Sequence, residues 1–186
     1  MCQSSWPEDG IEETVKPSTI WDSTQYMNMW TVKFTRNDLL GYAQFPNSSG
    51  LDGLETSGGA ANTDGVVSSY DVFGSNELGA GFLLASPYDK GRTMTHEVGH
   101  FLGLLHIWGD ATCGDDYCAD TPIHHKANYG CPSTIPSSCD IPAVNEMIQN
   151  YMDYTNDACM NIFTQNQKDR ILTVMTNSPR RSSLKT

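Results

Sequence analysis

Two histidines and a glutamate stand in the pattern His96-Glu97-x-x-His100, whose spacing suits metal chemistry. Residues four apart lie on one face of a helix, so His96 and His100 can direct both imidazoles at one point. Imidazole nitrogens are common ligands of zinc. Glu97 lies next to that point, where its carboxylate can accept a proton from a water molecule on the metal. The pattern therefore predicts hydrolytic chemistry at a zinc site.

A third histidine extends the pattern. Gly103 follows three residues after His100, and His106 follows three residues after Gly103. A ligand that stayed on the helix would lie too far along its axis, whereas a glycine with positive φ lets the chain turn and return His106 to the metal. Three neutral imidazoles leave one zinc position open for water, which is typical of catalytic zinc. The alternatives are a chance pattern on a surface helix and a bound metal without catalysis.

The elements that must position these side chains follow from hydrophobic periodicity. The clearest predicted helix covers residues 92–105. A second helix is predicted over 164–175, with Thr164 as N-cap and Gln167 completing a capping box. Aromatic and β-branched residues predict three strands, at 26–34, 40–45 and 65–73, and a short strand or turn at 78–84.

The overall composition is that of a folded acidic protein. The chain has 186 residues, 38% of them hydrophobic, and a formal net charge of −11. This length fits one domain, or two small lobes around a cleft. The acidic excess argues against nucleic acid and anionic membranes as partners. No apolar run approaches the roughly 20 residues that span a bilayer, so we expect no membrane span. We also expect the protein to be a monomer.

The cysteines favour disulfide bonds. Five of the six lie between Cys113 and Cys159, in a stretch rich in Gly, Pro, Ser and Asp. Their spacings are too loose for the close pairs of a structural zinc site, which is the alternative interpretation. Disulfides form in oxidising compartments, so we expect a secreted protein. The N-glycosylation acceptor at Asn47 agrees with secretion.

The motif and several segments around it resemble one protease family. HEVGHFLGLLH is similar to the zinc signature of the metzincins. Five further segments narrow the resemblance to the pappalysin (cytophagalysin) family of secreted metalloendopeptidases. They are LGYAQFP at 40–46, DGVV at 64–67, HIWGD at 106–110, DDYCADTP at 115–122 and QNYMDYTNDACMNIFTQNQ at 149–167.

The resemblance implies a fold and a division of the chain. The fold would be α+β and metzincin-like, with a twisted, mostly parallel sheet and helices in an upper lobe and an irregular, disulfide-stapled lower lobe with a C-terminal helix. A single catalytic domain would cover 1–186, with the upper lobe at about 1–103, the lower lobe at about 104–178 and a basic tail at 179–186. The strand and long backing helix that open such a lobe are not found in residues 1–25. We therefore expect an N-terminally truncated form.

The resemblance also implies roles for individual residues. His96, His100 and His106 would be the zinc ligands, and Glu97 the general base. Met152 would form the Met-turn, an apolar floor under the imidazoles.

Other implied roles have structural alternatives. Tyr154 would reach the zinc or the developing oxyanion, unless it only packs at the turn. Asp116 and Thr121 resemble a structural calcium-binding loop, for which a plain solvated acidic loop is the alternative.

Two disulfides are implied by the same resemblance: Cys113–Cys139 and Cys131–Cys159. Cys118 stands where the family usually has an apolar residue, and Cys2 is the remaining cysteine. These two form a third bridge, or leave one buried thiol and one free end.

The function that follows is that of a secreted zinc endopeptidase acting on protein or peptide substrates. The substrate would lie along the upper-lobe edge strand near 78–86 by strand addition. Asp153 and Asp157 follow the Met-turn, and a carboxylate at the pocket there would favour Arg or Lys after the cut. Both could instead cap the turn and face solvent. The alternatives are a secreted zinc-binding module with vestigial catalysis and a disulfide-stapled adhesin.

Overall fold

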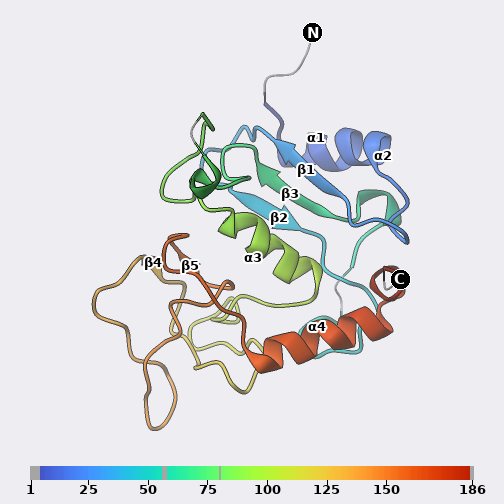
Figure 1. Cartoon of the computed structure of the whole chain (residues 1–186). Coiled ribbons are helices and arrows are strands. Elements are labelled where there is room, and N and C mark those ends of the chain that lie inside the picture. The colour runs from blue at the N-terminus through green and yellow to red at the C-terminus, as the bar shows by residue number, and fades with distance from the viewer. Residues whose placement is uncertain (1–4, 56–57, 80, 185–186) are drawn as a thin grey trace.

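The computed structural model describes residues 5–55, 58–79 and 81–184, which form two stacked lobes (Figure 1). The helical segments are α1 (Glu8–Gly10), η1 (Ile11–Val15), α2 (Lys16–Thr19), η2 (Ala61–Thr63), η3 (Asn76–Leu78), α3 (Arg92–Phe101), α4 (Gln165–Asn177) and α5 (Pro179–Ser182). The strands are β1 (Met29–Val32), β2 (Gly41–Ala43), β3 (Val66–Ser69), β4 (Tyr129–Gly130) and β5 (Tyr154–Thr155). This confirms the predicted α+β class. None of the described helices is long and apolar enough to cross a membrane.

The upper sheet has the strand order β1-β3-β2. β1 runs parallel to β3, with Met29 opposite Val66, and β2 runs antiparallel to β3, with Gly41 opposite Ser68. Val66 and Val67 of the central strand are fully buried, because helical segments cover both faces of the sheet. The three predicted strands are present, each shorter than predicted, and β2 is an edge strand.

The segment predicted as a short strand or turn at 78–84 forms no strand in its described residues. η3 ends at Leu78, and residues 81–85 form no strand. Gly79 and Gly81 both have positive φ, at 137° and 103°, a conformation that interrupts an extended strand. The prediction of an edge strand near 78–86 is therefore wrong.

Residues 8–19 are helical, which corrects the expectation that no backing helix would be found in 1–25. α1, η1 and α2 follow one another on the sheet face opposite α3 (Figure 1), with Ile11 fully buried against the sheet. The sequence did not indicate this helix because a lysine interrupts its apolar pattern. Lys16 occupies a position that faces the sheet and is only 1% exposed. Its ammonium pairs with Glu12 and lies over two aromatic rings, which compensates its burial.

The C-terminal segment returns to the upper lobe. Nε of Arg180 and an amino group of Arg181 each donate to Oδ2 of the buried Asp64, at 2.6 Å. Arg181 is itself fully buried, and its Nε donates to the carbonyl oxygen of Phe101 at 2.8 Å. The prediction of a basic tail is wrong for residues 179–184, because the buried carboxylate of Asp64 binds the guanidinium groups of Arg180 and Arg181.

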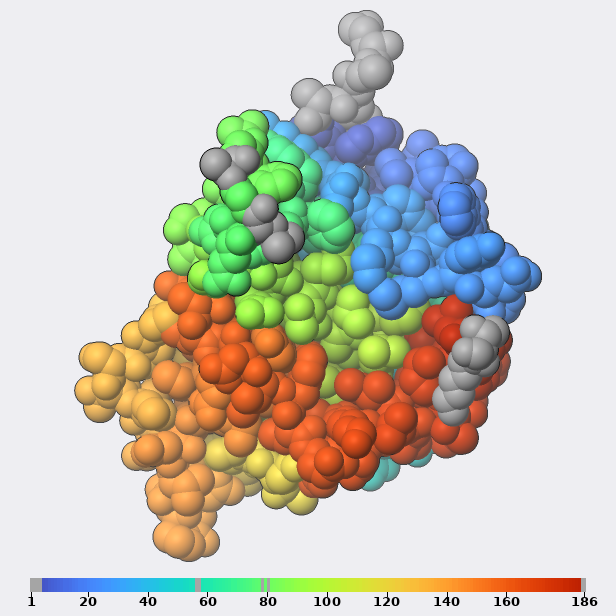
Figure 2. Space-filling model, in the orientation of Figure 1, coloured from blue at the N-terminus to red at the C-terminus, as the bar shows by residue number. Residues whose placement is uncertain are grey.

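The lower lobe is mostly irregular, with one short parallel pair, β4 and β5. Figure 2 shows much of this lobe bulging from the body of the molecule, while the C-terminal segment packs close to the chain around α3. Two disulfides close its loops, in the pairs that the resemblance implies: Cys113–Cys139 and Cys131–Cys159. Such links stabilise loop-rich structure by restricting the unfolded chain.

Cys118 carries a buried free thiol. Burial raises the pKa of this thiol to about 12, so it stays protonated and unreactive. Its suggested partner, Cys2, lies outside the described residues. Of the two interpretations of these cysteines, the structure fits the buried thiol.

Candidate metal centre and active site

Helix α3 carries His96, Glu97 and His100, and all three side chains are buried where the two lobes meet. The helix can approach the lower lobe closely because residue 99 is glycine. A Cβ at Gly99 would lie 2.5 Å from Sδ of Met152, closer than real Cβ contacts. The glycine inside the motif therefore has a packing reason of its own.

Gly103 ends the helical turn and redirects the chain. Its φ is +90°, and a Cβ there would lie 2.6 Å from Cγ2 of Val174 in α4. Neither the backbone conformation nor the space admits another residue. The turn brings Nε2 of His106 to 3.1 Å from Nε2 of His100, which lies 3.0 Å from Nε2 of His96. The structure thus gathers the three predicted ligands at one point.

The other ring nitrogen of each histidine faces an oxygen that can only accept a hydrogen bond. These Nδ1 contacts are His96 to the carbonyl oxygen of Tyr151 (2.7 Å), His100 to that of Leu104 (2.8 Å) and His106 to Oδ1 of Asp110 (2.6 Å). A neutral imidazole with its hydrogen on Nδ1 has its lone pair on Nε2. Three lone pairs therefore face one another, an arrangement that needs a cation, and three imidazole nitrogens suit zinc.

Burial supports the neutral state of these imidazoles. Desolvation lowers the pKa of His96 to about 3 and holds the pKa of His100 well below its usual range. Metal ligation requires the unprotonated nitrogen. The two buried histidines are therefore available as ligands across the physiological pH range.

The side chain of Glu97 extends from α3 toward the edge strand β2. The strand can pass this close because residue 41 is glycine: a Cβ at Gly41 would lie 2.9 Å from Cγ of Glu97 and 2.8 Å from the carbonyl oxygen of Val67. Burial raises the pKa of the Glu97 carboxyl to about 8. A carboxyl with its pKa near the working pH can both accept and return a proton.

Tyr154 lies against the histidine rings from the lower lobe, two residues after Met152. Met152 is fully buried, and its carbonyl oxygen accepts a hydrogen bond from the N–H of Ile107, next to the third histidine. The ring of Tyr154 lies 4.9 Å from that of His106 and 5.6 Å from that of His96, centroid to centroid. Burial raises the pKa of Tyr154 to about 12, so the phenol remains a hydrogen-bond donor.

The capping box predicted at the start of α4 is present, and it also fixes the turn around Met152. The Thr164 hydroxyl accepts a hydrogen bond from the N–H of Gln167. The side chains of Gln167 and Asn150 exchange two hydrogen bonds, of 2.9 and 3.0 Å, and Oδ1 of Asn150 accepts from the N–H of Met152. The helix cap and the turn around Met152 are thus one hydrogen-bonded unit.

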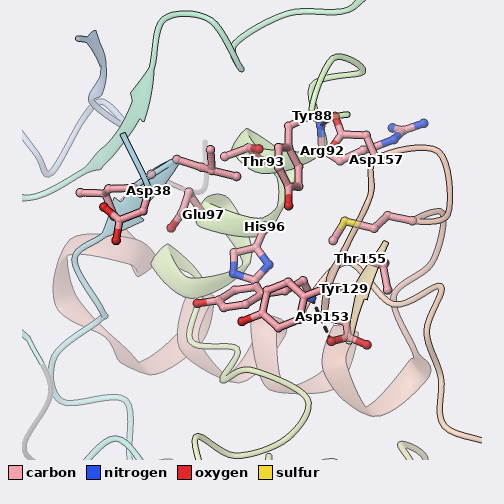
Figure 3. A pocket seen from close by; sticks show the side chains of 15 residues that line it. Asp38, Tyr88, Arg92, Thr93, His96, Glu97, Tyr129, Asp153, Thr155 and Asp157 are labelled. Atoms are coloured by element: carbon pink, nitrogen blue, oxygen red, sulfur yellow. Dashed lines mark hydrogen bonds between the residues drawn. The ribbon is translucent and has the colours of Figure 1, made fainter. Parts of the chain in front are cut away.

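A pocket opens beside His96 and Glu97, and Figure 3 shows Asp157 and Arg92 on its side near Tyr88. Oδ2 of Asp157 accepts the N–H groups of Lys90 and Arg92, at 2.8 and 3.1 Å. Among the described residues Oδ1 has no such hydrogen-bond partner. Burial raises the pKa of Asp157, although these hydrogen bonds oppose the shift.

Asp153 also lines the pocket, but both of its oxygens are occupied. Oδ1 accepts the N–H groups of Asn128 and Tyr154, at 2.8 and 2.9 Å, and Oδ2 accepts from Nδ2 of Asn128 at 3.0 Å. The carboxyl is fully buried, and burial raises its pKa. Asp153 therefore fixes the turn before Tyr154 rather than presenting a free oxygen to the pocket.

Asp116 and Thr121 lie together away from the histidines. The Thr121 hydroxyl donates to Oδ1 of Asp116 at 2.8 Å, and the N–H of Cys118 donates to the same oxygen. Oδ2 of Asp116 is buried without a hydrogen-bond partner among the described residues. Burial raises the pKa of this carboxyl to about 6.

Several site residues were not predicted. Tyr88 and Tyr129 line the pocket from a loop and from β4, positions that no local pattern indicates. Trp108 and Asp110 contact His106, and for them the sequence does hold a signal. A ligand histidine often donates its second ring N–H to a carboxylate, and Asp110 follows His106 by four residues.

Comparisons with known proteins agree with this geometry. The family model for M43 peptidases, described as pregnancy-associated plasma protein-A, matches residues 9–176. An extracellular metalloprotease of Sordaria macrospora is 35% identical over 169 residues, which cover 90% of this chain and 54% of the relative. One of Colletotrichum graminicola is 35% identical over 170 residues, covering 90% and 56%.

A solved structure is also similar. Mature mirolysin of Tannerella forsythia, in complex with a cleaved peptide, is 40% identical and superposes with a TM-score of 0.79, covering 98% of this chain and 65% of that one. The chain spans about half the length of the curated relatives it matches. By the family match over most of its residues, and by these relatives, the chain belongs to the pappalysin (M43) family of metallopeptidases.

Proposed function

We propose that this chain is a zinc-dependent endopeptidase that hydrolyses internal peptide bonds. The observation that carries the proposal is the convergence of three Nε2 atoms, with separations of 3.0 and 3.1 Å, next to a pocket that His96 and the buried Glu97 line. Its relatives named extracellular metalloproteases, and the cleaved peptide in the mirolysin complex, support the same reaction.

The reaction assigns a role to each polar group. Zinc held by the three histidines would supply Lewis acidity to water and to the scissile carbonyl. Glu97 accepts the proton of the attacking water and delivers it to the leaving amine. Tyr154, which keeps its proton, donates a hydrogen bond to the carbonyl oxygen as negative charge develops there.

The substrate backbone is proposed to lie along β2. This strand is one edge of the sheet, and Leu40 and Gly41 line the pocket beside Glu97. An extended peptide can add to such an edge by main-chain hydrogen bonds. β2 replaces the segment near 78–86, which forms no strand in its described part.

The direct test is digestion of unlabelled proteins and peptides by the purified chain, with cleavage sites read by mass spectrometry. We expect internal cleavage that 1,10-phenanthroline abolishes and that added zinc restores. Stoichiometric zinc binding without turnover would instead indicate the vestigial binding module. Full folding without stoichiometric zinc would indicate the adhesin.

Asp157 is proposed to set a preference for Arg, then Lys, after the cut. Replacing Asp157 with asparagine should weaken the preference for Arg over Leu by about 1–3 kcal/mol, because a charge-assisted hydrogen bond in the pocket is lost. The measurement is kcat/KM for paired peptides that differ only at that position. Asp38→Asn, at the exposed rim of the same pocket, is the matched control. A wild-type profile without Arg or Lys enrichment contradicts the proposal.

A structural calcium ion is proposed at Asp116, whose unpartnered buried Oδ2 suits a hard cation beside Thr121. After removal of all metals, zinc alone should restore only part of the thermal stability, and calcium the remainder. Asp116→Asn should remove the calcium-dependent part. Complete recovery with zinc alone argues against this site.

Secretion is proposed from the two disulfides and from the extracellular relatives. The two links would persist in an oxidising compartment and not in the cytosol. That the chain acts as a monomer stays a prediction.

A further inference from the structure

One of the three histidines has a different kind of partner at its second ring nitrogen, Nδ1. Nδ1 of His96 and of His100 each face a backbone carbonyl, whereas Nδ1 of His106 lies 2.6 Å from a carboxylate oxygen of Asp110. A hydrogen bond to a charged acceptor is shorter and stronger than one to a carbonyl. His106 is also the one that follows the helix and is held by a turn, so its orientation depends most on such a partner.

Two consecutive left-handed residues turn the backbone so that Asp110 lies next to His106. Gly109 and Asp110 both have left-handed φ, at 59° and 55°. A Cβ at Gly109 would lie 2.4 Å from the backbone nitrogen of Asp115, so only glycine fits there. A left-handed conformation is uncommon for a residue with a side chain, and such positions concentrate at functional sites.

Trp108 completes the support of the same imidazole. Its ring stacks on that of His106 with centroids 4.2 Å apart and planes 9° from parallel. Tyr154 meets the same His106 ring edge-on, with centroids 4.9 Å apart. With the ring plane fixed by stacking, the Asp110 carboxylate fixes the rotation of the ring in that plane and the tautomer.

We propose that Asp110 is a positioning residue for the metal, which holds His106 in the Nδ1–H tautomer and strengthens its Nε2 as a ligand. The proposal rests on the proposed zinc site. A carboxylate partner makes an imidazole a stronger donor, and losing such a partner typically weakens metal binding by about 10–100-fold. Asp110 is not one of the residues that line the pocket, and its carboxylate bonds to Nδ1 of His106, so its effect acts through His106.

The test is zinc affinity, measured by competition with a chromophoric chelator. Asp110→Asn should weaken zinc binding by about 10-fold and Asp110→Ala by about 10–100-fold. Asparagine also tolerates the left-handed backbone, so this variant isolates the charge from the fold. Glu13→Gln removes the same charge from an exposed position on η1 and should bind zinc as the wild type does.

Two further readouts separate positioning from general stability. The melting temperature of metal-free Asp110→Asn should equal that of the metal-free wild type, and its cobalt-substituted form should have an altered visible spectrum. If Asp110→Asn and Asp110→Ala both bind zinc within twofold of the wild type while His106→Ala loses it, the role of Asp110 is refuted and the zinc site stands. A wild type that binds no zinc overturns both.

Discussion

Replacing Glu97 with glutamine is expected to lower kcat by about 10²–10⁴-fold while zinc binding is retained, the usual scale for a general base. Glutamine fills the same space between α3 and Gly41, so the edge strand should keep its position. Its amide cannot accept the proton of the attacking water. The measurement is kcat on a peptide substrate, together with the zinc content of each protein.

Two controls make this result specific. Glu13→Gln on the outer helical segment removes an equal charge and should leave kcat unchanged. Glu97→Ala should lose as much activity as Glu97→Gln, because the base is absent in both. Turnover near the wild-type rate in the zinc-loaded Glu97→Gln protein would remove Glu97 from the mechanism.

Replacing Arg181 with methionine is expected to lower the free energy of unfolding by about 3 kcal/mol, at the lower end of the range for breaking a buried ion pair. Asp64 is 1% exposed and would lose two of its three arginine hydrogen bonds. The third comes from Arg180 and limits the loss. The carbonyl oxygens of Phe101 and Gln44 would also lose a donor. Urea unfolding with the disulfides intact measures the effect.

The charge itself can be separated from the packing of the side chain. Adding Asp64→Asn to Arg181→Met removes the uncompensated buried carboxylate and should recover part of the lost stability. Arg180→Met should cost less than Arg181→Met, because the Arg180 side chain is 14% exposed and that of Arg181 fully buried. A loss below about 1 kcal/mol in Arg181→Met, the range of exposed pairs, would contradict this account.

The residues of the proposed active site could be predicted from the sequence because their positions are related by local geometry. His96, Glu97 and His100 lie within one and a half turns of a helix, and Gly103 is the one residue type that lets His106 return. The capping box at Thr164 and the central strand are equally local. Each depends on backbone periodicity or on a single conformational requirement, so no distant contact is needed to predict it.

Other features depend on residues far apart in the chain. Asp64 and Arg181 are 117 residues apart, and only the fold turns two terminal arginines into part of the core. The backing helix could not be predicted because Lys16 occupies one of its buried positions. That burial depends on two aromatic rings of the sheet, over which the ammonium group lies. The pocket shares this dependence: Asp153 and Asp157 look alike in sequence, and their hydrogen bonds to Asn128 and Lys90 give them different roles.

The sequence by itself therefore determined the helix that carries His96, Glu97 and His100, the return of the third histidine and the resemblance to a family of proteases. The tertiary structure alone decided which edge strand lies beside Glu97, which carboxylate at the pocket keeps an oxygen without a hydrogen bond, and which carboxylate lies next to Nδ1 of His106. The reason is physical. The spacing of metal ligands on a helix follows from helix geometry, which is local in the sequence. Whether a polar group is paired or keeps a free hydrogen-bonding atom depends on the residues that the fold places around it.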